Sequence, residues 1–458
     1  FSMSNMEQKK ENIMGTMGIT NLIMKMSLPL MISMLIQALY NIVDSMFVAR
    51  VSETALTAVS LAFPLQNLLI AFGVGTGVGM ASYLSRKLGE NDTETATKAA
   101  GNGITLAVIT WILFAVLGLT IVKPFMSLFT DDVELLNLST GYSEIVMILS
   151  LFMLISMMNE RILQGTGDSF SSMVSQMTGA ITNIILDPVF IFTFGMGVNG
   201  AAIATVIGQA VSCSVSLFFV LRNKYINVKP HHLKLSRRMV SSIYAVGAPT
   251  IITNSIGTIM TGAMNAILIG FSTTAVSIFS VYFKLQSFVF MPIFGLSSGM
   301  VPIIAYNYGA RKKERMMATI KIGTLIAVLI MVLGTLVFNL FPNALLSLFS
   351  ATEEMYRLGV PALKTISFCF VFAAISIGLG SSFQATGYGM GTMIVSIARQ
   401  LLVLIPVAYV LSKLIGINGV WLSFIVAEGI GLIVSIVLYI KVYDSRIKPI
   451  GEKEVFSE

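Results

Sequence analysis

Charged residues are scarce in this chain of 458 residues, at 11%, whereas hydrophobic residues make up 55%. A soluble domain carries about 25% charged residues, and a mean hydropathy of +0.85 does not suit a surface exposed to water. The composition therefore excludes a soluble protein and indicates an integral membrane protein. The net charge of +7 is scattered over short loops, so we expect no nucleic-acid partner.

Cysteine and histidine are also rare, with two of each. Cys213 and Cys369 fall inside apolar stretches, so we interpret them as small apolar fillers and expect no disulfide. The sequence contains no Gly-x-x-x-x-Gly-Lys-Ser/Thr loop and no polar segment long enough for a nucleotide-binding domain. Any transport must therefore use an ion gradient. We expect no enzymatic activity and no cofactor beyond the coupling ion.

Long apolar runs, in contrast, dominate the chain. A hydrocarbon core of roughly 30 Å needs about 20 helical residues to cross it. We therefore expect an all-α membrane protein with twelve transmembrane helices, six in each half of the chain. The predicted spans are residues 21–48, 55–84, 97–121, 141–164, 172–194, 198–222, 241–270, 275–308, 316–341, 358–383, 390–411 and 418–443.

The sequence is also duplicated. Residues 29–89 match residues 249–309 at a constant offset of 220 without a gap, and fourteen of these pairs are identical. The same offset aligns residues 164–167 with residues 384–387. The duplication predicts two six-helix bundles related by a pseudo-twofold axis along the membrane normal, an arrangement typical of secondary transporters.

Lys and Arg gather in loops on one side of the predicted membrane, mainly in 85–92, 222–240 and 310–315, and at both termini. Short cytoplasmic loops carry such an excess, so we expect both termini in the cytoplasm and no cleavable signal peptide. Residues 223–240 form the longest polar interruption. We interpret them as a cytoplasmic basic linker between an N-terminal bundle (1–222) and a C-terminal bundle (241–458). His231 and His232 lie in it, and we expect a solvated segment rather than a metal site.

Ionisable side chains inside a span are costly, so each is a functional candidate. Asp44, Asp187 and Thr205 fall about 6–10 Å below the outer surface at about 1.5 Å per residue, and Asn183 lies one turn from Asp187 on the same face. Pro188 frees a backbone carbonyl one turn earlier. These oxygens suit a monovalent cation or a shared proton. The structural alternative is that Asp44 reaches the interface and Asp187 caps its own bent helix.

The second half of the chain lacks this cluster, because Met264 replaces Asp44 and Ile405-Pro406 keeps the proline without the acid. It carries Arg399 and Glu428 at mid-membrane instead. We expect them to pair, since pairing neutralises both charges; a part in substrate handling is the other interpretation. Three further polar residues are candidates for substrate or structural contacts: Gln66, Gln286 and Lys284.

Four sequence runs together resemble the multidrug and toxic compound extrusion (MATE) transporters, over essentially the whole chain. They are Tyr40-Asn41-Ile42-Val43-Asp44, Gln164-Gly165-Thr166-Gly167-Asp168, Asn183-Ile184-Ile185-Leu186-Asp187-Pro188 and Gly197-Val198-Asn199-Gly200-Ala201-Ala202. Arg399-Gln400 and the overall sequence are most similar to the MepA-like bacterial branch. Branches that place an acidic coupling residue in the seventh or eighth helix find no counterpart here.

The resemblance implies a V-shaped pair of bundles in a bacterial cell membrane, which exports lipophilic cationic drugs and dyes against an inward flow of Na⁺ or H⁺. It also implies that Asp44, Asn183, Asp187 and Thr205 bind the coupling cation. We expect a monomer. The 29 methionine and 29 phenylalanine residues would suit flat lipophilic cations if they line the central cleft.

Two other transporter classes are alternatives to a MATE transporter. A lipid-linked precursor flippase of a related superfamily needs cationic cavity residues for a pyrophosphate, and only Arg399, Lys284 and Arg161 could serve. A transporter of the major facilitator type carries a Gly-x-x-x-Asp-Arg-x-Gly-Arg-like loop between its second and third helices. Residues 85–92 do not match that loop.

Overall fold

The computed structural model describes residues 11–349 and 351–452, and the regular elements of this part are helical. The N-terminal half contains α1 (Ile13–Thr16), α2 (Ile19–Val51), α3 (Glu53–Gly89), α4 (Thr93–Thr120), α5 (Val122–Ser127), α6 (Val133–Ile148), α7 (Leu151–Gly165), α8 (Ser169–Pro188) and α9 (Val198–Leu221). The C-terminal half contains α10 (Arg237–Ile269), α11 (Thr273–Gly309), α12 (Lys313–Leu340), α13 (Pro342–Ser347), α14 (Glu353–Ile366), α15 (Phe370–Ala385), α16 (Gly389–Ser396), α17 (Ile405–Leu414), α18 (Ile417–Val442) and α19 (Pro449–Glu452). Three π-helical segments of the described part, Val189–Thr193, Ile397–Leu404 and Tyr443–Ile447, follow α8, α16 and α18.

These helices confirm the twelve predicted spans. A helix satisfies its own backbone hydrogen bonds, as the interior of a bilayer requires. Eleven helices of the described part are long and apolar enough to cross a membrane, and α6 with α7 forms a twelfth span bent by 47°. The bend was not predicted. The observed span begins at Val133, eight residues before the expected span 141–164, and Leu149 and Ser150 separate its two helices.

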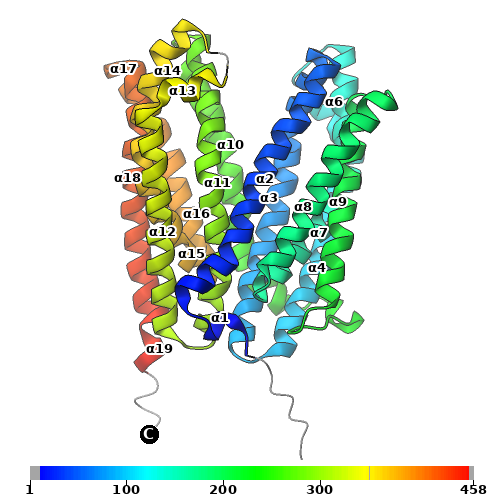
Figure 1. The fold of residues 1–458 in the computed structure, drawn as a ribbon, viewed down its shortest axis with the longest axis vertical. Coiled ribbons are helices and arrows are strands. Elements are labelled where there is room, and N and C mark those ends of the chain that lie inside the picture. The colour runs from blue at the N-terminus through cyan, green and yellow to red at the C-terminus, as the bar shows by residue number, and fades with distance from the viewer. Residues whose placement is uncertain (1–10, 350, 453–458) are drawn as a thin grey trace, which may run out of the picture.

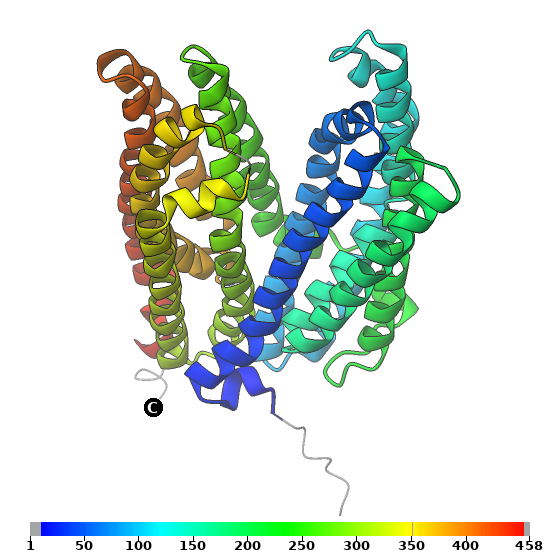
Figure 2. The same cartoon turned by 45° about the horizontal axis from the view of Figure 1, so that its top comes forward.

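The two halves form two bundles that meet at one end and diverge toward the other (Figures 1 and 2). Helix α1 lies where they meet and bonds to both. The Asn12 side-chain amide donates to the Thr166 carbonyl oxygen of the N-terminal half at 2.8 Å. The Asn307 amide and the Arg315 guanidinium of the C-terminal half both donate to the Met14 carbonyl oxygen at 2.9 Å. This short helix therefore ties the bundles together.

Duplicated glycines line the contact between the bundles, which we call the seam. A methyl group added at Gly79 of α3 would lie 2.0 Å from the Ile243 carbonyl oxygen of α10. A methyl group at the equivalent Gly299 of α11 would lie 2.2 Å from Ser27 Oγ of α2. Real side chains do not approach backbone this closely, so only glycine fits. The seam glycines are Gly75, Gly79 and Gly89, with their equivalents Gly295, Gly299 and Gly309.

The same duplication sets where helices begin. Ser52 Oγ accepts from the Ala55 N–H at 3.0 Å and caps α3. Ser272 Oγ accepts from the Ala275 N–H at 3.1 Å and caps α11. Serine is a favoured N-cap residue because its hydroxyl oxygen satisfies a free N–H of the first turn. The repeated sequence thus encodes the same helix start twice.

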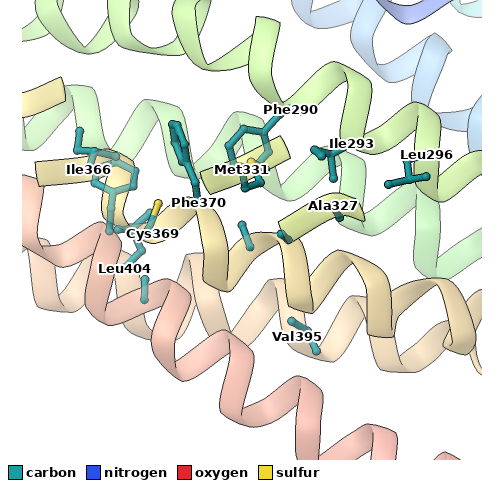
Figure 3. Packing of buried hydrophobic residues seen from close by; sticks show 14 of the residues in the cluster. Phe290, Ile293, Leu296, Ala327, Met331, Ile366, Cys369, Phe370, Val395 and Leu404 are labelled. Carbon is teal, nitrogen blue, oxygen red and sulfur yellow. The ribbon is translucent and has the colours of Figure 1, made fainter. Parts of the chain in front are cut away.

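The C-terminal bundle has a densely packed apolar core, part of which is shown in Figure 3. Phe290 of α11 and Phe370 of α15 meet edge to face, with ring centroids 5.4 Å apart and planes at 84°. Met331 of α12 and Ile366 of α14 are fully buried in the same cluster. On the outer faces, large apolar side chains such as Leu336 remain exposed, which suits contact with lipid.

The segment between the bundles differs from the prediction. It ends sooner than residue 240, because α10 begins at Arg237. It is also not simply solvated, since His232 is only 3% exposed. The Asn102 side chain of α4 donates to the carbonyl oxygens of His232 at 3.2 Å and Lys234 at 3.1 Å. The linker therefore packs onto the N-terminal bundle. The chain termini, with Lys9, Lys10 and Lys453, lie outside the described residues.

Candidate cation site

The structure brings the four predicted cation-site residues together in the N-terminal bundle. Asp44 comes from α2, Asn183 and Asp187 from α8, and Thr205 from α9. Asp187 is fully buried, and Asn183 and Thr205 are nearly so. The carboxyl groups of Asp44 and Asp187 are near enough to each other to interact. Three helices thus place two acids and two neutral oxygen ligands side by side.

Tyr40 organises this cluster and was not identified as a site residue from the sequence. Its hydroxyl accepts a hydrogen bond from the Asn183 side-chain amide and lies 3.5 Å from Thr205 Oγ1. Tyr40 precedes Asp44 by one helical turn, so the i, i+4 spacing places both on one face of α2. That spacing was the signal in the sequence that could have found it.

Several oxygens of the cluster have no hydrogen-bond partner among the described residues. They are Asp44 Oδ1, both carboxylate oxygens of Asp187, and Asn183 Oδ1. Thr205 donates its hydroxyl proton to the Ala201 carbonyl oxygen at 2.9 Å, and its Oγ1 accepts from the Asn183 amide at 3.4 Å. Two neighbouring carboxylates repel unless a proton or a cation lies between them. The site therefore suits a shared proton or a hard monovalent cation with oxygen ligands.

A second cluster of possible metal ligands lies at the linker and consists of Glu94, His231 and His232. The Lys229 N–H donates to His232 Nδ1 at 2.9 Å, so Nδ1 carries no proton. A neutral imidazole must then carry its proton on Nε2, which lies 3.1 Å from Glu94 Oε1. That nitrogen donates to the carboxylate and has no lone pair for a metal. His232 thus fixes the linker to α4.

A further buried acid, Glu160 of α7, was not predicted as a site residue. Its Oε1 accepts from Ser156 Oγ at 3.1 Å and Ser212 Oγ at 3.3 Å, and its Oε2 accepts from Gln176 Nε2 at 2.8 Å. These partners come from α7, α8 and α9, so Glu160 holds three helices together. The sequence did contain a signal for Glu160, because this acid lies four residues before the end of the predicted span 141–164.

In the C-terminal bundle, Arg399 and Glu428 form the expected ion pair, with Nη1 and Oε1 3.1 Å apart. Gln286 lines a cavity beside this pair, whereas Gln66 donates to the Tyr142 hydroxyl in the other bundle at 3.4 Å. Lys284 does not support a substrate role, because its side chain is exposed on α11 and does not line the cavity.

Comparison with known proteins shows the family. The family model MatE matches residues 29–189 and 249–410, one copy in each half of the chain. The chain belongs to the MatE family, the MATE transporters. The family suggested by the sequence motifs is thereby confirmed, and this MATE transporter is a multi-pass membrane protein.

Relatives of this MATE transporter match it over most of its length. The multidrug export protein MepA of Staphylococcus haemolyticus (strain JCSC1435) is 30% identical over 411 residues, which make up 88% of this chain and 90% of that protein. MepA of Staphylococcus aureus (strain NCTC 8325 / PS 47) is 27% identical over 410 residues, 89% of this chain and 90% of that protein. The solved outward-facing conformation of a multidrug resistance MATE family transporter of the MOP superfamily has a TM-score of 0.89 at 25% identity, and the match covers 99% of this chain and 100% of that chain.

Proposed function

We propose that this MATE transporter is an antiporter that exports lipophilic cationic drugs and dyes in exchange for Na⁺ or H⁺. The observation that carries the proposal is the pair of neighbouring carboxyl groups of Asp44 and Asp187, with oxygens that lack hydrogen-bond partners in the described part of the chain. A buried acid pair of this kind binds a cation or a proton and releases it when its surroundings change. The relatives named multidrug export proteins support the choice of substrates.

Helix α2 provides a route from ion binding to movement of the bundles. Its C-terminal part carries Tyr40 and Asp44 to α8 and α9, whereas Ser27 and Met31 pack against the seam glycines Gly299 and Gly295 of α11. The two regions are about 20 Å apart along one helix at 1.5 Å per residue. A cation or proton between Asp44 and Asp187 draws α2 toward α8, and the other end of α2 transmits that change to the contact with the C-terminal bundle.

The basic loops support an orientation in which the seam faces the cytoplasm. The bundles then diverge toward the outside, and the acid cluster lies nearer the outer surface, where an inward-moving ion arrives first. Binding of that ion competes with a cationic substrate between the bundles, which couples the two flows. We propose that the transporter works as a monomer in the bacterial cell membrane, without nucleic-acid partners.

The lipid-linked precursor flippase is not favoured. Its pyrophosphate would need a cluster of cationic cavity residues, and Lys284, one of the three candidates, does not line the cavity. The relatives found over about nine-tenths of the chain are named as drug exporters.

The proposal is tested with proteoliposomes loaded with a fluorescent lipophilic cation such as ethidium, under an imposed Na⁺ gradient or an imposed pH gradient. We expect one gradient to drive export, and Asp187→Asn to reduce export to the level of empty liposomes. Asp168→Asn is the matched control, because Asp168 caps the other end of α8 and asparagine retains that cap. Export by Asp187→Asn at the wild-type rate would overturn the coupling role.

A further inference from the structure

A cavity of about 480 Å³ lies in the C-terminal bundle and extends to α3 and α7 of the N-terminal bundle. Its volume is within the range of pockets for drug-sized molecules. It lies apart from the acid cluster, because neither Asp44 nor Asp187 lines it. Six aromatic side chains contribute to its wall: Tyr282, Phe283, Phe290, Phe294, Phe383 and Phe424. Such a wall suits a compact apolar body with rings.

The charge of this cavity is opposite to the one a site for cations needs. Its charged lining residues are Arg161, Arg399 and Glu428. Glu428 pairs with Arg399 at 3.1 Å, which leaves Arg161 as a positive charge in excess.

Arg161 has no acidic partner within the described residues. Its Nη1 donates only to the neutral Gln164 Oε1, at 3.4 Å. The neighbouring Glu160 does not compensate it, because both Glu160 carboxylate oxygens already bind Ser156, Ser212 and Gln176. Arg161 is half-buried and lines the cavity. A guanidinium cannot lose its charge in a protein, so an anionic group in the cavity would gain a charge-assisted hydrogen bond there.

Gly77 of α3 leaves space for the Arg161 side chain. A methyl group at Gly77 would lie 2.7 Å from Arg161 Cγ, so the glycine accommodates the stem of the side chain. Other polar atoms of the lining residues also lack partners within the described part of the chain: Arg399 Nε, Gln400 Oε1, Ser376 Oγ and Thr392 Oγ1. Apolar walls with a few unsatisfied polar groups are characteristic of ligand sites.

We propose that this cavity is a second ligand site, which takes a compact aromatic amphiphile with one anionic group and holds that group at Arg161. The site deepens the proposed export function by adding a class of compound of opposite charge. Binding there depends neither on an ion gradient nor on Asp187, so it can fail or succeed independently of the antiport.

Binding is measured with dansylglycine, a small aromatic carboxylate, on the full chain in phosphatidylcholine nanodiscs. The chain has two tryptophans, and Trp421 lies two turns from Glu428 on α18. In a Trp111→Phe background, Trp421 is therefore the only donor for energy transfer to dansyl. We expect saturable transfer with dansylglycine, and weaker transfer with a dansyl derivative that carries a trimethylammonium group.

The deciding variant is Arg161→Gln, which we expect to weaken dansylglycine binding about tenfold or more, since a charge-assisted bond is lost. Arg238→Gln is the matched control, because Arg238 is exposed at the start of α10 and does not line the cavity. It should bind as the parent does. Arg161→Lys retains the charge and should retain most of the affinity, which separates loss of charge from loss of folding.

Equal affinities for the two dansyl compounds, or unchanged affinity in Arg161→Gln, would overturn the proposal. Anionic phosphatidylglycerol in the nanodiscs distinguishes a free ligand from a lipid headgroup. If it abolishes dansylglycine binding, the site belongs to an anionic lipid, and the proposal of a compact ligand is wrong. Retention of binding in Asp187→Asn is expected, and its loss would contradict the independence of the two sites.

Discussion

The same helix crossing is built in two different ways in the two halves of the molecule. In the N-terminal bundle, α8 and α9 touch at Gly179 and Gly208, where a methyl group on Gly208 would lie 2.8 Å from the Gly179 carbonyl oxygen. In the C-terminal bundle, Arg399 follows Gly179 by 220 residues. Glu428 lies next to the counterpart of Gly208, because the runs 197–200 and 416–419 are offset by 219. One half thus joins its helices backbone to backbone, and the other places an ion pair between them.

The two bundles also differ inside. The N-terminal bundle holds polar clusters around Asp187 and Glu160. In the C-terminal bundle, Arg399 and Glu428 line a cavity of about 480 Å³. A duplicated backbone can therefore hold an ion site in one copy and a cavity in the other.

Breaking the ion pair should have the largest effect on stability. Glu428→Met leaves the partly buried Arg399 guanidinium without its partner, and we expect a loss of about 3 kcal/mol. The double change Arg399→Met with Glu428→Met should restore most of that loss, because it removes both charges. The measurement is unfolding of the purified protein in detergent.

The matched control in the N-terminal bundle is Gln209→Met. Gln209 directly follows Gly208 on α9 and is uncharged. It should cost far less than Glu428→Met. Equal effects of these two single changes would show that the ion pair does not stabilise the C-terminal crossing.

The second test adds a side chain at the close contact between α8 and α9 in the N-terminal bundle. Gly208→Ala places a methyl group 2.8 Å from the Gly179 carbonyl oxygen and 3.0 Å from Asn183 Cβ. The helices must separate, and overpacking of this kind costs about 1–3 kcal/mol. Because Asn183 belongs to the cation cluster, drug export should fall as well.

Gly429→Ala in α18 is the control for this test, because nothing lies within 4 Å of its added methyl group. In the interior of a helix, that change should stabilise the protein by about 0.5–1 kcal/mol. Thermal unfolding of both variants should therefore shift in opposite directions, and shifts in the same direction would refute the close crossing.

The smallest effect is expected at a turn that both halves share. Asn91 and Arg311, 220 residues apart, have positive φ angles of 60° and 58°. Asparagine tolerates this left-handed conformation better than arginine does. Arg311→Asn should therefore raise stability by about 1 kcal/mol, and Asn91→Arg should lower it by a similar amount, as measured by thermal unfolding. A loss of stability in Arg311→Asn would mean that the Arg311 bond to the Ile450 carbonyl oxygen outweighs the backbone conformation.

Much of the fold could be predicted from the sequence, because apolar length, basic loops and a constant offset are properties of the chain itself. The meeting of Asp44 and Asp187 followed from their similar depths, and the pairing of Arg399 with Glu428 followed from the cost of isolated charges. The bend between α6 and α7 was missed because neither Gly nor Pro marks residues 149–150.

The predictions that failed concern the directions in which side chains point, not their depths in the membrane. Glu160 was overlooked beside Arg161, although the two neighbours point to different surroundings, one to a serine and glutamine network and the other to a cavity. Lys284 was placed correctly in a span but proved exposed on α11. His232 was expected in solvent, yet contacts from Asn102, 130 residues earlier, bury it. No single sequence shows which helices will be neighbours on each face.

The seam has the reciprocity of contacts found in a twofold symmetric dimer. Gly89 meets the backbone of Tyr306, and Gly309 meets the backbone of Arg86, the residue that stands 220 positions before Tyr306. In such an isologous interface, each contact between a first and a second site is matched by its mirror partner. The chain thus contains the interface of a homodimer within one molecule, and the segment between α9 and α10 joins what are, in geometry, two subunits.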